Sequence, residues 1–485
     1  MLWRITKREI YDHFTSLRFA LALGMITLLM VLNGLIFVGS DYKGRLSEYS
    51  QSIAGVADRV KAICDHLNEL ATQGPGGFYK RPSSLAFCAN DQEDSLPVRI
   101  GAQGLGTWMW GGDKPERSYR FEFPWKLGYP QDAYQKNSML QSFTALDWSF
   151  IVGVVMSFVA ILFTFDAISG ERESGTLKLT MSNSVPRDVI LLGKFFGAFI
   201  AVAVPLLMGM ILSLLIVSIS GSVSLDGNDW KRIGLMAVIS FIYISLFISL
   251  GLFVSTRMRH SSTSLLVLLF IWVVLVVLIP NTLGSVVSTL RKVPSQREFQ
   301  QQRDAMNKEL NKSGDELFKY GSPTQPNPNP KAIELWADYV TSMSKINTQL
   351  DDGHLDDQFA QVQLARRILR SASPTTIYNY VMESLAGTGF GRHRKFVDAT
   401  RRYRGQFVDF IKSADRSDSK SLHFYYLKEG LSDKPVTYED IPRFVEPTNL
   451  ITTLRDDLIN MGLLLLLLVM LFFASYISLL RCDVR

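Results

Sequence analysis

Long stretches without charge constrain this chain more than any other feature of its sequence. The hydrocarbon core of a bilayer is about 30 Å thick, and a helix needs roughly 20 apolar residues to cross it. The mean hydropathy is +0.13 and 47% of the 485 residues are hydrophobic, which is unusual for a water-soluble protein. We expect a mainly α-helical membrane protein with six transmembrane helices, at residues 19–38, 148–165, 189–218, 233–255, 262–280 and 458–480.

The first apolar stretch is expected to remain in the protein as a membrane helix. A cleavable signal peptide has a shorter apolar core and a small-residue cleavage site. In residues 1–18, before this stretch, Trp3, Ile10 and Phe14 recur at helical spacing. This pattern predicts an amphipathic helix on the inner membrane surface. The alternative is a simple cytoplasmic extension of the first transmembrane helix.

The orientation follows from Lys and Arg in the short flanks, because these charges resist translocation. In a six-helix plan the basic residues of four flanks fall on one side, and only Lys231 and Arg232 fall on the other. Both termini, including the tail at residues 481–485, are therefore expected in the cytoplasm. Residues 39–147 and 281–457 are expected to form the outer segments.

Four residues inside the apolar stretches have distinct properties. Lys194 carries a charge and lies near enough to a helix end to reach the interface by snorkelling. Pro205, Gly24 and Gly34 mark places where a helix bends or approaches a neighbour closely. Ordinary packing is the alternative for these three.

The two outer segments are expected to form a composite, mostly helical periplasmic domain. Residues 46–70 are predicted to be helical, and the Gly, Pro and aromatic residues that follow suit turns and short strands. Prolines within residues 321–330 forbid a continued helix. Helices are predicted on either side of them at residues 297–320, 332–350, 358–371, 374–385 and 395–413. The aromatic residues of the first segment either line a binding groove or, more commonly, pack in a core or anchor at the membrane surface; they are Trp108, Trp110, Phe121, Phe123, Trp125 and Tyr129.

Three cysteines are too few for a disulfide-rich scaffold or a multi-cysteine metal site. Cys64 and Cys88 both lie in the first outer segment, where an oxidising compartment favours a disulfide between them. Two separate buried thiols are the alternative. Cys482 is expected on the other side of the membrane, and the six histidines are too scattered to predict a metal site.

The sequence lacks the usual motifs of an ATPase or hydrolase. No Gly-x-x-x-x-Gly-Lys-[Ser/Thr] motif occurs, so no phosphate-binding loop is expected, and we assign no catalytic residue. The 51 basic residues against 45 acidic ones are a mild excess, which does not indicate nucleic-acid binding.

The most informative segment is the short inner connector at residues 166–188. It concentrates glycines, acids and a short amphipathic run between two membrane helices. We expect a short helix across the inner face, with Ile168, Leu177 and Leu179 toward the membrane. The charged residues Glu171, Arg172 and Glu173 would then face a partner. A tight connector without a partner is the alternative.

Residues 170–179, Gly-Glu-Arg-Glu-Ser-Gly-Thr-Leu-Lys-Leu, resemble the signature of type-2 ABC exporter permeases. The resemblance is closest to the branch of the gliding-motility permeases and the permeases of nitrous-oxide-reductase maturation. A second stretch, Ser373-Pro374 with residues 385–389 and Phe396, resembles a subgroup with a long outer insertion. The resemblance implies that a separate ATPase subunit docks on the coupling residues Gly170, Glu171, Arg172, Glu173, Ser174, Gly175 and Thr176.

The resemblance also implies a function. The chain would be the permease subunit of an ATP-driven exporter in the bacterial inner membrane, binding no cofactor itself, with ATP and Mg²⁺ held by the ATPase. Its other partners would be a second identical or homologous permease, membrane lipids and a periplasmic protein. One alternative is a mechanotransmitter that acts on a periplasmic partner without passing a solute. Another is a membrane-embedded enzyme, which the lack of converging polar residues in the helices disfavours.

Overall fold

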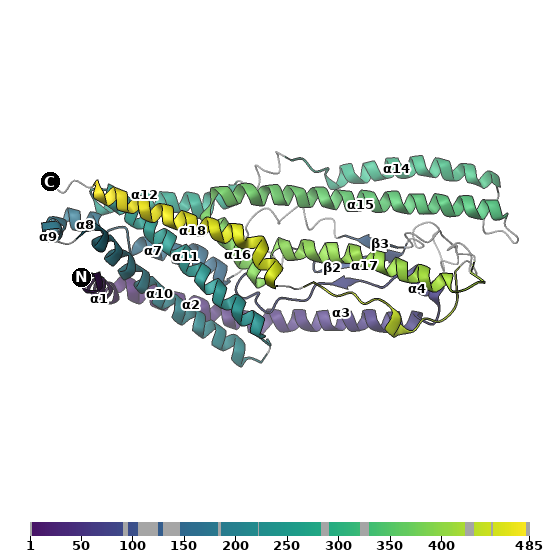
Figure 1. Cartoon of the computed structure of the whole chain (residues 1–485), viewed down its shortest axis with the longest axis horizontal. Helices are drawn as coiled ribbons and strands as arrows, with labels where there is room; N and C mark the ends of the chain where they lie inside the picture. Colours follow the sequence, from purple (N-terminus) through teal and green to yellow (C-terminus); the bar gives the residue numbers. More distant parts are fainter. Residues whose placement is uncertain are drawn as a thin grey trace.

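The structure is a computed structural model, and the molecule is elongated (Figure 1). A helical bundle forms one end. We call the other end the outer part, because it contains most of the segments predicted at residues 39–147 and 281–457. It describes residues 2–90, 96–104, 125–129, 146–182, 186–221, 223–282, 291–320, 329–421, 431–447 and 450–481. The main helices of the bundle are α2 (Leu17–Ile36), α7 (Ser157–Leu162), α10 (Arg187–Ile219), α11 (Gly227–Arg257), α12 (Ser261–Trp272) and α18 (Leu450–Leu480).

Five helices in the described part of the chain are long and apolar enough to cross a membrane. They span Leu17–Ile63, Arg187–Ile219, Gly227–Arg257, Ser261–Thr282 and Asp457–Leu480. Each contains one of the apolar stretches predicted from sequence, so the multi-pass membrane class is confirmed.

The remaining predicted stretch forms a shorter apolar helix, Trp148–Leu162, inside the same bundle. It consists of α6 (Trp148–Phe150), a π-helical segment, η3 (Ile151–Met156), and α7. Asp147 caps its start by accepting a hydrogen bond from the backbone N–H of Phe150 at 2.7 Å. The predicted helix at residues 148–165 therefore exists, but it is shorter than an ordinary membrane span.

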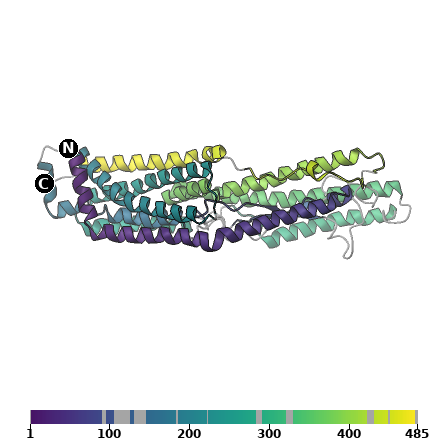
Figure 2. The same cartoon turned by 90° about the horizontal axis from the view of Figure 1, so that it is seen from below.

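The first membrane helix does not stop at the bundle. It continues from α2 through a π-helical segment, η1 (Phe37–Asp41), into α3 (Tyr42–Ile63), and Figure 2 shows this purple helix running along much of the molecule. The predicted outer helix at residues 46–70 is thus confirmed as α3 followed by α4 (Leu67–Gln73). One continuous helix connects the bundle to the outer part.

Small residues bring the bundle helices close together. A Cβ on Gly34 would lie 3.3 Å from the backbone oxygen of Ser213 in α10, and one on Gly209 would lie 2.8 Å from the side chain of Met30. The prediction of close packing at Gly34 is confirmed, whereas Gly24 has nothing within 4 Å. Pro205 lies inside the continuous helix α10. Close approach through small residues is typical of membrane helix interfaces.

Helix α16 (Pro374–Ala386) is the unexpected member of the bundle. Its start is as predicted, since Ser373 caps the helix and Pro374 opens it. The helix nevertheless packs against α11 and α18 and joins the bundle core rather than the outer part. The ring of Tyr378 stacks on Tyr243 of α11 at 4.4 Å between centroids. Its length of 13 residues is too short to span a membrane, so hydropathy alone did not place it there.

The outer part combines long helices with a small sheet. Its other long helices are α14 (Gln296–Leu317), the 43-residue α15 (Pro330–Ala372) and α17 (Phe390–Arg416). The predicted helices at residues 332–350 and 358–371 are one continuous helix, because no proline separates them. The sheet is antiparallel, in the order β1 (Phe78–Tyr79), β2 (Arg99–Gly104), β3 (Trp125–Gly128). Short 3-10 turns occur at Phe318–Tyr320 and Tyr438–Asp440.

The predicted proline break between α14 and α15 is confirmed by where the helices end. The first finishes in the 3-10 turn at Phe318–Tyr320, and the second begins with Pro330 at its first turn after the cap Asn329. Residues 321–328, which form the rest of the predicted loop, lie outside the described residues.

The outer part has its own apolar core, formed by α4, the sheet, α15 and α17. Of the aromatic residues considered as a groove, Trp125 and Tyr129 are described. Tyr129 donates a hydrogen bond to Asp352 of α15 at 2.6 Å and accepts one from Arg401 of α17 at 3.1 Å. Tyr129 therefore cross-links helices. The other four aromatic residues lie outside the described residues.

The predicted disulfide is not formed, and this expectation is corrected. Cys64 and Cys88 are both free and buried. Cys64 belongs to the core of the outer part, whereas Cys88 belongs to the core of the bundle, so the two thiols lie in different cores. The alternative of two separate buried thiols describes the structure. Cys482 lies outside the described residues.

Candidate functional site

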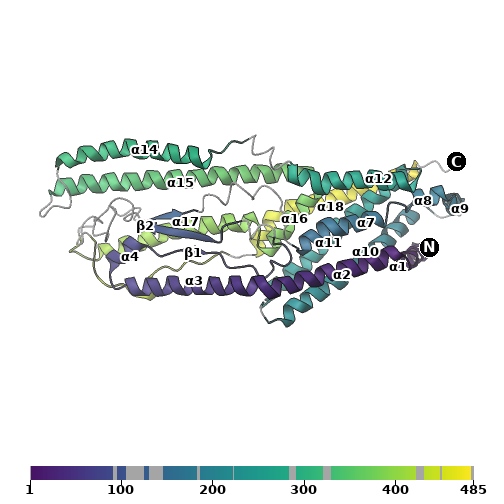
Figure 3. The same cartoon turned by 180° about the vertical axis from the view of Figure 1, so that it is seen from behind.

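The inner connector forms a small helix-turn-helix at the end of the bundle away from the outer part (Figure 3). It consists of α8 (Ser169–Glu173) and α9 (Thr176–Ser182). Gly175 joins them with a φ of +77°, a backbone conformation that glycine adopts without strain. The sequence pattern around Gly175 thus makes a sharp turn, which allows α9 to project from the bundle.

The start of α8 is firmly held by α11. The backbone N–H groups of Ile168 and Ser169 both donate to the hydroxyl of Ser255 at 3.0 Å, and all three residues are buried. Asp166, just before α8, forms an ion pair with Arg18 at 2.9 Å, which links the connector to the start of α2. The connector is therefore a structured part of the bundle rather than a loose loop.

Lys194 of α10 is the centre of a buried charge cluster. Its side chain is only 5% exposed, and Nζ lies 2.9 Å from Oε1 of Glu9 and 2.8 Å from Oε1 of Glu171. The expectation that Lys194 snorkels to the interface is corrected, because its ammonium group binds two carboxylates inside the protein. This cluster, which we call the Lys194 triad, joins α1 (Leu2–Phe14), α8 and α10.

Glycines of α10 allow α1 to reach the triad. A Cβ on Gly193 would lie 2.6 Å from the side chain of Ile5, and one on Gly197 would lie 2.5 Å from Cβ of Glu9. Any larger residue at these positions would push α1 away. The predicted amphipathic helix at residues 1–18 thus exists as α1. One side of α1 packs against the glycines of α10, while Trp3 and Tyr11 are exposed.

The other two charged residues of α8 also have partners within the chain. Arg172 donates to the backbone oxygens of Met258 at 3.1 Å and Thr256 at 3.4 Å, at the end of α11. A positive charge there is favoured by the helix dipole. Glu173 accepts hydrogen bonds from the backbone N–H and hydroxyl of Ser261 at the start of α12, and these bonds lower the pKa of Glu173.

The exposed surface of the connector differs in part from the one expected, because Glu173 is exposed whereas Glu171 and Arg172 are half-buried. Glu171, Arg172 and Glu173 connect α8 to α10, α11 and α12, while Ser174 to Lys178 leave only Leu177 buried. Leu179 is 69% exposed, and its contact with the membrane stays a prediction. We call the exposed residues Ser174, Gly175, Thr176, Lys178 and Leu179 the α9 tip.

Sequence reasoning located the connector but missed Glu9 and Lys194 as parts of the site. The available signal was Lys194 itself, because a charge inside a long apolar stretch usually has a partner. Among the described residues no group of three His, Cys, Asp or Glu side chains could hold a metal ion.

A bundle of long apolar helices with a structured connector at one end defines a multi-pass membrane protein. A family model described as ABC-2 family transporter protein matches residues 3–484, so the chain belongs to the ABC-2 transporter permease family. The family resemblance recognised from residues 170–179 is thereby confirmed. Permeases of this kind generally work with an ABC ATPase.

Two curated relatives are similar over a short region. The chain is 44% identical over 55 residues to the probable ABC transporter permease protein NosY of Stutzerimonas stutzeri, and 42% identical over 55 residues to the protein of the same name from Pseudomonas aeruginosa. Each match covers 11% of this chain and 20% of the relative. The chain therefore spans about a fifth of the length of these relatives.

Proposed function

We propose that this chain is the permease subunit of an ATP-driven exporter in a bacterial inner membrane, and that a separate ATPase docks on the α9 tip. Membership of the ABC-2 family supports the permease role. The observation that carries the docking proposal is the α9 tip itself, an exposed turn with an exposed leucine that follows α8, whose three charged side chains all contact the bundle.

The arrangement of the chain ends supports a cytoplasmic location for the tip. Helix α1, the connector and the C-terminal end of α18 lie at the same end of the bundle, opposite the outer part (Figure 1). With the short helix Trp148–Leu162 counted as a crossing, six crossings would put both ends of the chain on the same side of the membrane as the connector. We assign that side to the cytoplasm, and the outer part to the periplasm, because the basic residues of four short flanks lie there.

The coupling mechanism follows from the contacts of α8. A displacement of the α9 tip by a closing ATPase is transmitted to α10 through Glu171, to α11 through Arg172 and to α12 through Glu173. Three membrane helices would thus respond to one docking event. ATP and Mg²⁺ belong to the ATPase, and the permease itself catalyses no reaction. Two copies, identical or homologous, would complete the transporter.

Cysteine labelling tests the topology independently of transport. In a background without native cysteines, Lys331→Cys at the start of α15 is expected to react with an impermeant maleimide in intact spheroplasts. Ser174→Cys at the α9 tip is expected to react only after permeabilisation. Both residues are exposed in the structure, so burial does not explain a failure to react. Labelling of Ser174→Cys in intact spheroplasts would contradict the proposed orientation.

A mechanotransmitter remains the second candidate function, because one observation favours it. The continuous helix Leu17–Ile63 crosses from the bundle into the outer part, so movement in the bundle is carried directly outward. The two functions differ in solute flux. Reconstituted vesicles that hydrolyse ATP and change the outer part, but move no solute, would favour the mechanotransmitter over the exporter.

A further inference from the structure

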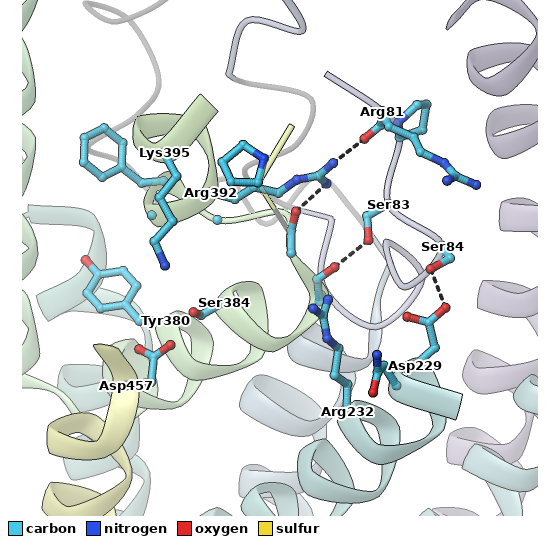
Figure 4. Close-up of a pocket in the computed structure, with 18 of the residues that line it drawn as sticks. Arg81, Ser83, Ser84, Asp229, Arg232, Tyr380, Ser384, Arg392, Lys395 and Asp457 are labelled. Atoms are coloured by element: carbon cyan, nitrogen blue, oxygen red, sulfur yellow. Dashed lines mark hydrogen bonds between the residues drawn. The ribbon is translucent and has the colours of Figure 1, made fainter. Parts of the chain in front are cut away.

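A large polar pocket lies where the outer ends of the bundle helices meet the outer part (Figure 4). Its volume is about 750 Å³, within the range of small-molecule binding sites. The walls come from residues 81–84, the start of α11, the second half of α15, α16 with its following turn, the start of α17 and the start of α18. We call this the boundary pocket. It lies at the opposite end of the bundle from the α9 tip, so it does not overlap the proposed ATPase-docking surface.

The boundary pocket is lined by an excess of positive charge. Three aspartates line it, Asp226, Asp229 and Asp457, against the seven basic residues Arg81, Arg232, Arg366, Arg367, Arg370, Arg392 and Lys395. Two of the arginines are already paired with carboxylates just outside the lining, Arg392 with the half-buried Glu446 at 2.7 Å and Arg366 with the buried Glu383 at 3.3 Å. Counting these two glutamates, positive charge still exceeds negative charge.

Arg232 is the basic residue best placed to bind a ligand. Its Nε is buried and has no hydrogen-bond partner within the described part of the chain. Its guanidinium group lies over Gly387, where an added Cβ would be 3.7 Å from Nη1. Gly387 ends α16 with a φ of +72° and carries no side chain toward the arginine. A buried N–H donor without an acceptor is unfavourable, so an acceptor supplied by a ligand would stabilise this site.

The other arginines indicate which kind of anion fits. Arg367 and Arg370 come from α15 and Arg232 comes from α11, so guanidinium groups reach the pocket from different helices. Arg370 is held in place by a hydrogen bond to Asn460 of α18 at 3.3 Å. A planar carboxylate can form both of its hydrogen bonds with one guanidinium group. A phosphate group offers three acceptor oxygens, which donors can reach from several directions, so it suits arginines on different helices better.

We propose that the boundary pocket binds a phosphate-bearing ligand through Arg232 and Arg367. The volume exceeds that of a phosphate group alone, and Asn228, Asn460 and Asp457 provide polar groups for the rest of the ligand. At the outer end of the bundle the phosphate comes either from a phospholipid headgroup or from a soluble phosphorylated small molecule. The phosphate contact is the same in both cases.

Calorimetry on the purified full-length permease in a neutral detergent tests the proposal. The probes are dihexanoyl phosphatidylglycerol, glucose 6-phosphate and inorganic phosphate, with dihexanoylglycerol and glucose as counterparts that lack phosphate. Saturable binding of at least one phosphate probe, without binding of its counterpart, is the expected result. Preference for the phosphatidylglycerol assigns a lipid source, and preference for the sugar phosphate assigns a soluble one. No saturable binding of any phosphate probe overturns the proposal.

Two substitutions locate the site. Arg232→Gln and Arg367→Gln are each expected to weaken binding by about tenfold or more, because each removes hydrogen bonds from a charged donor to a charged acceptor. Lys231→Gln is the matched control, since Lys231 is an exposed neighbour on the same helix and does not line the pocket. Arg367 is exposed, so its replacement leaves the fold intact even if Arg232→Gln does not. Unchanged affinity in Arg367→Gln, or an equal loss in Lys231→Gln, overturns the assignment.

Discussion

The Lys194 triad gives a quantitative prediction about the anchoring of the connector. In Lys194→Met, the carboxylates of Glu9 and Glu171 lose the ammonium group that joins them. Each carboxylate oxygen lies within 2.9 Å of Nζ, so the two oxygens are no more than about 6 Å apart. Two like charges at that separation repel by roughly 3 kcal/mol at an effective dielectric constant of about 20. Glu9 and Glu171 are 18% and 29% exposed, so water screens this repulsion only in part.

We expect this repulsion to detach α1 and α8 from α10 while the rest of the bundle stays folded. If the free energy needed to detach α1 and α8 falls by about 3 kcal/mol, the population of the detached state rises about 100-fold. Hydrogen–deuterium exchange of the amides in α1 and α8 measures this directly on the purified full-length protein. The same amides are expected to keep their protection in Lys178→Met, which removes an exposed positive charge from α9.

A triple variant separates charge repulsion from lost packing. Lys194→Met combined with Glu9→Gln and Glu171→Gln removes all three charges, and a buried charge cluster replaced as a whole is often tolerated. Protection of α1 and α8 is therefore expected to recover substantially in the triple variant. If Lys194→Met alone exchanges like the unmodified protein, the triad does not anchor the connector and the reasoning is refuted.

Two further predictions concern pH and close packing. His393 of α17 is fully buried, and burial, with a smaller effect of Lys80, lowers its pKa to about 3. Below about pH 6.5 the unfolded chain takes up a proton at this residue, so the stability contributed by neutral His393 is present above that pH and is lost as the pH falls toward 3. Acidification from pH 7 to pH 5 should lower the free energy of unfolding by about 2 kcal/mol. In thermal unfolding, His393→Gln should reduce this loss of stability. A Cβ on Gly251 of α11 would clash with the side chain of Thr164, so Gly251→Ala should destabilise the bundle by about 1 to 3 kcal/mol. Gly234→Ala on the same helix, with nothing within 4 Å, is the control, and a Gly251→Ala protein as stable as that control would contradict the packing.

Hydropathy predicts the membrane class well. In lipid, unpaired backbone groups and charged side chains cost so much free energy that a membrane-spanning segment here must be a long apolar helix. It does not predict how α16 is placed, since a helix of 13 residues can be buried in the bundle without spanning it. It also does not predict that α2 and α3 are one helix. The sequence predicted separate helices at residues 19–38 and 46–70, but in the structure the helix continues between them through a π-helical segment.

The connector was located by its local residue pattern, whereas its contacts depend on residues far away in sequence. Glu9 and Lys194 are separated by 185 positions, and Glu173 and Ser261 by 88. No local pattern specifies such pairs. Charges in a short polar connector suggest that they face solvent or a partner, whereas the three charged residues of α8 contact α10, α11 and α12. The cysteine prediction was wrong for a similar reason, because chain proximity did not reveal that the two thiols belong to different cores.

The most direct test of the central claim is whether the α9 tip is needed for an ATPase to bind and respond. Lys178→Glu combined with Leu179→Asp changes two exposed residues and leaves the Lys194 triad, Arg172 and Glu173 intact. Stoichiometry of the copurified ATPase and permease-dependent ATP turnover are measured for this variant and for Lys231→Glu, which reverses a lysine charge at the outer end of the bundle. The account predicts loss of both in the tip variant and normal values in Lys231→Glu. Normal ATPase association and turnover in a correctly folded tip variant would contradict it.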